Sequence, residues 1–118
     1  MLYLIMNDYY IKAVLLDGCP YSIAAKDLLA THNINANVIN VNNKNKNEFK
    51  TSLINTFPQI YLCKTGDNGT QLLGGYDDLF DFISNFKGKK YNEQNIDNFM
   101  KKYSWSKKAT LRMIQHIN

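Results

Sequence analysis

The residue best suited to chemistry in this 118-residue chain is Cys19, which lies in the sequence GCPYS at 18–22. An apolar run at 11–16 precedes it, and Pro20 follows it. Because proline is tolerated in the first turn of a helix, Cys19 is expected at a helix N-terminus. There, unpaired backbone N–H groups and the positive end of the helix dipole stabilise a thiolate, the form that attacks disulfides. The pattern therefore indicates a reactive cysteine; a small buried cysteine at a strand–helix corner is the alternative.

Other side chains bear on the reactivity of that thiol. The Ser22 hydroxyl is three residues on, within helical reach, and is expected to hydrogen-bond the sulfur. Cys63 lies about 16 Å beyond Pro58 along an extended segment, at ~3.3 Å per residue, whereas a disulfide needs its Cα atoms within about 7 Å. We therefore expect Cys63 to be a buried structural thiol. His32 and His116 lack metal-ligand spacing, so no metal site is predicted.

Two further segments could hold a small peptide beside this cysteine. TFP at 56–58 precedes a strand, and a cis bond before Pro58 would expose the Phe57 backbone N–H and C=O to an incoming peptide. A trans, strand-initiating proline is the alternative. In GGYDD at 74–78, backbone N–H groups at a helix start can hold a carboxylate, and an aspartate can hold an ammonium group. A glycine turn with an Asp cap is the alternative. Together the three segments suit a small peptide that carries a thiol.

The hydrophobic pattern predicts the elements that position these segments. Strands are expected at 11–16, 36–41, 59–63 and 70–73, and turn residues at 64–69 make the last two an antiparallel hairpin. A further strand is expected at 2–6, followed by an Asn7-Asp8 turn. The crossover between the strands at 11–16 and 36–41 is long enough for parallel pairing.

Helices are expected at 20–32, at 48–53 and from Asp77 to Gly88. Their apolar faces are predicted at Ile23, Ala24, Leu28 and Thr31, widened by Ala25 and Leu29; at Phe49 and Leu53; and at Leu79, Ile83 and Phe86. Two more helical patterns follow, over Ile96, Phe99, Met100 and Tyr103 and over Ala109, Leu111, Met113, Ile114 and Ile117.

Composition limits the class of protein. With 45% hydrophobic and 20% charged residues, the chain is neither disordered nor fibrous, and no apolar run approaches the ~20 residues that span a bilayer. Two cysteines cannot form a disulfide framework, and the opening MLYLIM lacks signal-peptide features, so reduced thiols in a cytosol are expected. The net charge is −2 over residues 1–86 and +6 over 87–118. That basic segment is interpreted as a solvated helix face or as a surface for anionic partners.

The segments CPYS at 19–22, TFPQIYL at 56–62 and GGYDDL at 74–79 resemble the glutaredoxin family over about residues 11–87. The resemblance implies an α/β thioredoxin fold, a central mixed sheet of about four strands flanked by helices. Together with the two C-terminal helical patterns and the basic charge there, it divides the chain into a glutaredoxin-like domain at 1–88 and a basic helical extension at 89–118 packed on it. The implied activity is a glutathione-dependent thiol–disulfide oxidoreductase. The implied site residues are Cys19 as nucleophile and, for glutathione binding, Tyr21, Phe57, Pro58, Tyr76, Asp77 and Asp78.

The chain departs from the family pattern near the nucleophile. Ser22 replaces the second cysteine of dithiol members, which implies a monothiol route in which a second glutathione regenerates Cys19. Leu16 stands where the family often has a lysine for the glycine carboxylate of glutathione. The segment between the second strand and Pro58 is shorter than is usual in the family, and Lys50 is the expected substitute for another carboxylate partner lost with it. The carboxylate of Asp17 is expected to oppose thiolate formation.

Glutathione as co-substrate, and glutathionylated proteins or small disulfides as partners, therefore form the leading prediction, with a cytoplasmic location. A host cytosol or virion is the expected location if an AT-rich large DNA virus encodes the chain. One alternative is a carrier of a [2Fe-2S] cluster, in which Cys19 and glutathione from each of two chains supply four thiolates. Another is an inactive binding module whose basic tail contacts DNA. No membrane partner is predicted, and nucleic acid is the less favoured partner.

Overall fold

The computed structural model describes residues 9–66 and 69–118. Its strands are β1 (Tyr9–Leu16), β2 (Asn37–Val41), β3 (Gln59–Lys64) and β4 (Thr70–Gly74). Its helices are α2 (Pro20–Thr31), the short 3-10 helix η1 (Lys46–Phe49), α3 (Tyr76–Phe86), α4 (Glu93–Tyr103) and α5 (Lys107–Ile117). The strand expected at 2–6 and its Asn7-Asp8 turn lie outside the described residues.

The four strands form one mixed sheet in the order β2-β1-β3-β4. β1 pairs in parallel with β2 and antiparallel with β3, and β3 pairs antiparallel with β4. This confirms the α/β class, the parallel crossover through α2 and the hairpin that turn residues predicted. Because β1 is central, it is buried on both faces: Ile11, Ala13 and Leu15 belong to the main core, and Val14 belongs to a smaller cluster.

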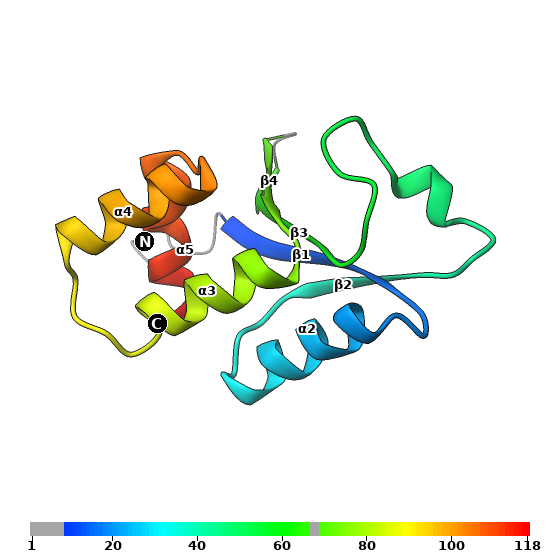
Figure 1. The fold of residues 1–118 in the computed structure, drawn as a ribbon, viewed down its shortest axis with the longest axis horizontal. Coiled ribbons are helices and arrows are strands. Elements are labelled where there is room, and N and C mark those ends of the chain that lie inside the picture. The colour runs from blue at the N-terminus through cyan, green and yellow to red at the C-terminus, as the bar shows by residue number, and fades with distance from the viewer. Residues whose placement is uncertain (1–8, 67–68) are drawn as a thin grey trace.

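Helices α2 and α3 lie side by side against the sheet, and α4 and α5 gather near the start of β1 (Figure 1). The main core joins the sheet to all four α helices that the structure describes. A smaller cluster contains Val14, Val41 and Phe57, with Phe49 of η1 packed against it. The sheet thus has a large core under its helices and a small core beneath the segment at 42–57.

The C-terminal helices share the main core with the sheet. Buried side chains Ile96, Phe99, Ala109, Met113 and Ile117 come from α4 and α5. Asn92 caps α4 by accepting a hydrogen bond from the Asn95 N–H at 3.0 Å, and Ser106 caps α5 in the same way. Both predicted helical patterns are therefore confirmed as helices, whereas a domain boundary at residue 88 stays a prediction.

Two expectations about helices were wrong. The helix predicted at 48–53 is a single 3-10 turn at Lys46–Phe49, and Leu53 is 81% exposed in the loop that follows. The chain does not continue as a helix to residue 53, because the Thr51 hydroxyl accepts hydrogen bonds from the backbone N–H groups of Leu53 and Ile54. In α2 the buried residues are Ser22, Ala25 and Leu29, whereas Ile23 is 54% exposed. The buried face is rotated because Ser22 turns inward to the end of β1.

Candidate active site

The turn between β1 and α2 holds Cys19 in place through backbone hydrogen bonds. The Cys19 N–H donates to the Leu16 carbonyl at 3.1 Å, and the Asp17 N–H donates to the Val41 carbonyl of β2 at 2.8 Å. Gly18 has φ 75°, a left-handed conformation that glycine adopts without steric cost. Cys19 is the N-cap of α2 and Pro20 its first residue, as the sequence predicted. The sulfur therefore lies at the N-terminal end of a three-turn helix.

Ser22 forms hydrogen bonds with both this turn and the Cys19 sulfur. It is 2% exposed, and its hydroxyl oxygen accepts a hydrogen bond from the Leu16 N–H at 3.0 Å. The hydroxyl proton is then free to point to the sulfur of Cys19. Partial burial raises the pKa of Cys19. Hydrogen bonds from the Ser22 N–H and hydroxyl and from the Tyr21 N–H together lower it by more, so the pKa of the thiol is below its ordinary value. Asp17, the expected opposing charge, is exposed, and solvent screens it.

The segment before β3 borders the sulfur on its other side. The Phe57-Pro58 peptide bond is cis, one of the two possibilities considered. The Cys19 Sγ lies 3.8 Å from the Phe57 carbonyl oxygen. The Phe57 ring and Pro58 are buried, so this segment faces the cysteine mainly with its backbone. Within the described residues, no hydrogen bond involves the Phe57 N–H.

The third segment forms the junction of β4 and α3. The Asp78 Oδ2 accepts a hydrogen bond from the Gly75 N–H at 2.9 Å, which caps α3. Gly74 has φ 132°, and a Cβ there would lie 2.4 Å from the Asp78 carboxylate, so a side chain is excluded on both grounds. Asp77 is exposed, whereas the Asp78 carboxylate is partly buried and one of its oxygens already caps α3. Asp77 is thus the freer carboxylate for a ligand.

These segments line one open groove of about 460 Å³. The predicted residues that line it are Tyr21, Phe57, Pro58, Tyr76, Asp77 and Asp78. Cys19 is at its edge through the contact with Phe57. The rings of Tyr21 and Tyr76 have centroids 6.1 Å apart, and Tyr76 stacks on Phe80 at 5.9 Å. The structure therefore brings together all the residues proposed from the sequence to act on glutathione.

Sequence reasoning missed part of the groove wall. Leu53 and Ile54 line it from the loop after η1, and Leu72 lines it from β4. A helical pattern assigned Leu53 to an apolar helix face, whereas its exposure places it at the groove rim. Nothing local in the sequence brings this loop beside α3, so the signal was not available before the fold was known.

The groove is poor in positive charge. Among its lining residues in the described part of the chain there is no lysine or arginine. Leu16 does not supply the cation that the family often has, and Lys50, the expected substitute for another carboxylate partner, is exposed and does not line the groove. A bound carboxylate must therefore rely on backbone N–H groups, of which the start of α3 offers the nearest set.

Cys63 lies on β3, away from the groove. It is 3% exposed, and its sulfur accepts a hydrogen bond from the Thr70 hydroxyl at 3.8 Å. Both cysteines are free thiols. Within residues 9–66 and 69–118, no group of three or more His, Cys, Asp or Glu side chains is arranged to hold a metal ion. Each chain therefore offers one accessible thiol, so a four-thiolate cluster would need ligands from outside it.

Comparisons with known proteins agree with this geometry. The sequence profile of the glutaredoxin family matches residues 8–65. A crystal structure of glutaredoxin 1 from Francisella tularensis, complexed with cacodylate, has a similar fold, with a TM-score of 0.51. Its sequence is 24% identical, and the alignment covers 69% of this chain and 99% of that one. No curated protein sequence matches the chain. The profile match covers the turn that holds Cys19 and strands β1, β2 and β3, so this part of the chain matches the glutaredoxin family, and the mixed sheet with its flanking helices is a thioredoxin-like fold.

Proposed function

We propose that the protein is a glutathione-dependent thiol–disulfide oxidoreductase that works by a monothiol route through Cys19. The observation that carries this proposal is the position of one thiol with a lowered pKa beside an open groove lined by the Phe57-Pro58 segment and by the exposed Asp77 carboxylate. Its substrates are glutathionylated proteins or small glutathione disulfides. We place the reaction in a reducing cytoplasm, where both cysteines stay free.

The reaction balances with two molecules of glutathione. The Cys19 thiolate attacks the glutathione sulfur of a mixed disulfide, that S–S bond breaks, and the substrate leaves as a thiolate that takes up a proton. Cys19 is then joined to glutathione. A second glutathione thiolate attacks the glutathione sulfur of this intermediate, which releases oxidised glutathione and restores the Cys19 thiolate. Ser22 has no sulfur with which to intercept the intermediate, and Cys63 is buried elsewhere.

The groove suggests how each part of glutathione is bound. The Phe57 N–H and C=O suit the backbone of the glutathione cysteine, which keeps its sulfur near Cys19. The Asp77 carboxylate suits the ammonium of the γ-glutamyl group. The rings of Tyr21 and Tyr76 would cover the aliphatic parts of the tripeptide. Because no cation lines the groove, we expect a higher KM for glutathione than a lysine-bearing groove would give.

The direct test is glutathione-coupled turnover of a glutathione mixed disulfide. Cys19→Ser should lower turnover by about a thousandfold or more, because a hydroxyl is a far weaker nucleophile and leaving group. Cys63→Ser is the matched control and should leave turnover nearly unchanged. Equal rates for the parent and Cys19→Ser would contradict the assignment.

Glutathione recognition is tested separately from chemistry. Asp77→Asn should raise the KM for glutathione by about tenfold, the value of one charge-assisted hydrogen bond, and leave kcat nearly unchanged. Asp27→Asn is the control, since Asp27 is exposed on α2 and outside the groove. If the two variants have the same KM, the γ-glutamyl group is not bound as we propose.

A further inference from the structure

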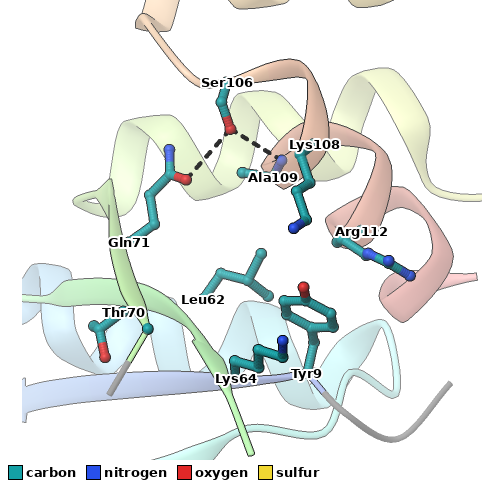
Figure 2. A pocket seen from close by; sticks show the side chains of 10 residues that line it. Tyr9, Leu62, Lys64, Thr70, Gln71, Ser106, Lys108, Ala109 and Arg112 are labelled. Atoms are coloured by element: carbon teal, nitrogen blue, oxygen red, sulfur yellow. Dashed lines mark hydrogen bonds between the residues drawn. The ribbon is translucent and has the colours of Figure 1, made fainter. Parts of the chain in front are cut away.

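A second cavity lies at the opposite end of the sheet from Cys19. It has a volume of about 360 Å³ and lies between the β3–β4 hairpin and α5 (Figure 2). Tyr9 begins β1, whereas Cys19 follows the end of that strand, so about 23 Å of extended chain separates the two sites. The cavity is therefore independent of the groove and of the function proposed for it.

Three cations surround this cavity. Lys64 comes from β3, and Lys108 and Arg112 come from one face of α5, four residues apart. Figure 2 shows the Lys108 side chain pointing from α5 toward the strands, with Lys64 and Tyr9 below it. The Arg112 guanidinium lies 4.8 Å from the centroid of the Tyr9 ring, which restricts its position. The positive charge thus comes from two elements that are distant in sequence.

The charged residues that the structure describes around the cavity all carry positive charge. Among the residues described as lining the cavity there is no aspartate or glutamate. The two ion pairs found in the described part of the chain are Lys102 with Asp81 and Lys107 with Glu93, and neither includes a cavity cation. Like charges repel one another, so an anion entering the cavity would relieve the repulsion among Lys64, Lys108 and Arg112.

A neutral donor and a helix dipole add to this environment. Ser106 caps α5, and its hydroxyl lies at the cavity wall, where it accepts a hydrogen bond from the Ala109 N–H at 3.1 Å. The positive end of the α5 dipole therefore faces the cavity. The Tyr9 hydroxyl points into the cavity (Figure 2), and buried Leu62 forms an apolar floor. The hydroxyls of Thr70 and Ser106 already donate to Cys63 Sγ and Gln71 Oε1. The site therefore combines positive charge, the Tyr9 hydroxyl and an apolar floor, which suits a phosphoryl group.

We propose that this cavity binds a small phosphorylated molecule through Lys64, Lys108 and Arg112. A small ligand is favoured over a nucleic acid because the three cations line one hollow within the size range of small-molecule pockets, rather than following a groove. A phosphate is favoured over a monocarboxylate because three cations match an anion that carries at least two negative charges. The basic character of the C-terminal segment thereby acquires a specific role at the N-terminal half of α5.

The test measures binding of inorganic pyrophosphate and of adenosine diphosphate by calorimetry at an ionic strength of about 0.15 M. The variant Lys64→Gln/Lys108→Gln/Arg112→Gln removes the three cavity cations from the full chain. The matched control, Lys89→Gln/Lys90→Gln/Lys101→Gln, removes the same charge from exposed positions outside the cavity. Circular dichroism of both variants checks that they are folded.

We expect saturable binding of pyrophosphate by the parent, at least about a tenfold loss in the cavity variant, and less than about a twofold change in the control. Tighter binding of adenosine diphosphate would support the proposal and identify a nucleotide as the ligand, whereas equal affinity would support recognition of the phosphoryl groups alone. Absence of saturable pyrophosphate binding, or equal losses in both variants, would overturn it. Binding of duplex DNA without binding of pyrophosphate would also overturn it, in favour of a nucleic-acid surface.

Discussion

The two ends of the sheet are held together by different kinds of contact. At the groove end, Cys19, Phe57 and Gly75 come from turns, and their contacts use backbone groups: the Cys19 thiol contacts the Phe57 carbonyl oxygen, and the Gly75 N–H donates to the Asp78 carboxylate. At the far end, the rings of Phe82, Phe86, Phe99 and Trp105 form a buried cluster with centroids 4.9–5.5 Å apart. Buried area dominates stability, whereas exposed polar groups are needed for chemistry. The residues proposed for chemistry and the aromatic residues that stabilise the fold therefore lie in separate regions of the molecule.

Helix α3 belongs to both regions. Its first turn presents Tyr76 and Asp77 to the groove, and its later turns bury Phe82 and Phe86 in the aromatic cluster. The helix can therefore position the groove because its other end is fixed in the core. Substitutions at the far end should reduce the free energy of unfolding and leave the folded active site intact.

The largest effect on stability is expected from Trp105→Ala. Trp105 is 4% exposed, and its Nε1–H donates to the Leu73 carbonyl at 2.8 Å. Removing the ring should lower the free energy of unfolding by about 3–5 kcal/mol, and Trp105→Phe, which loses the hydrogen bond, by about 1–3 kcal/mol. Urea unfolding measures both. A loss below about 1 kcal/mol for Trp105→Ala would contradict the role given to this cluster.

Gly74→Ala should affect the groove end and stability together. The new Cβ meets the Asp78 carboxylate and the φ of 132° disfavours a side chain, so we expect a loss of about 1–3 kcal/mol. Because α3 loses its cap, the KM for glutathione should also rise. Gly88→Ala is the matched control, since its φ is 70° and its Cβ would meet no atom within 4 Å. That variant should be destabilised with an unchanged KM; equal KM values for the two variants would break the proposed link.

The smallest effect is expected at the junction of α3 and α4. The Tyr103 hydroxyl donates a hydrogen bond to Asp81 and lowers the pKa of that carboxyl, Lys102 lowers it further, and burial opposes them. A lowered pKa in the folded state means that this stabilisation is present above the unfolded value of about 3.9 and is lost as the pH falls through the folded value. Asp81→Asn should therefore reduce stability by about 1 kcal/mol at about pH 7 and much less at about pH 2. A pH-independent difference in urea unfolding would contradict this assignment.

The sequence could predict the groove because its signals are local. Pro20 sets a helix start, Gly74 marks the end of a strand, and the acidic residues that follow indicate a helix N-terminus. These signals located all three segments in the correct order. The elements around them were also largely predictable, because alternation and helical spacing report which face of a strand or helix is buried.

The errors occurred where tertiary contacts decide the structure. Ile23 fits a helical apolar stripe, but the inward turn of Ser22 leaves it in solvent. The spacing of Phe49 and Leu53 suggested a helix that the Thr51 hydroxyl interrupts. The second cavity was not predictable either, because Lys64 and Arg112 are far apart in sequence and only the packing of α5 on the sheet brings them together.

The pH dependence of Cys19 alkylation tests the proposed chemistry most directly. Hydrogen bonds from Ser22 and Tyr21 outweigh burial and lower the pKa of the thiol, so the midpoint of alkylation should lie below the value of about 8.5 for a free thiol. Ser22→Ala removes one of those hydrogen bonds and should move the midpoint upward; the measurement in Cys63→Ser keeps the signal specific to one sulfur. A midpoint at or above about 8.5 in the parent would contradict a thiolate nucleophile at this helix terminus.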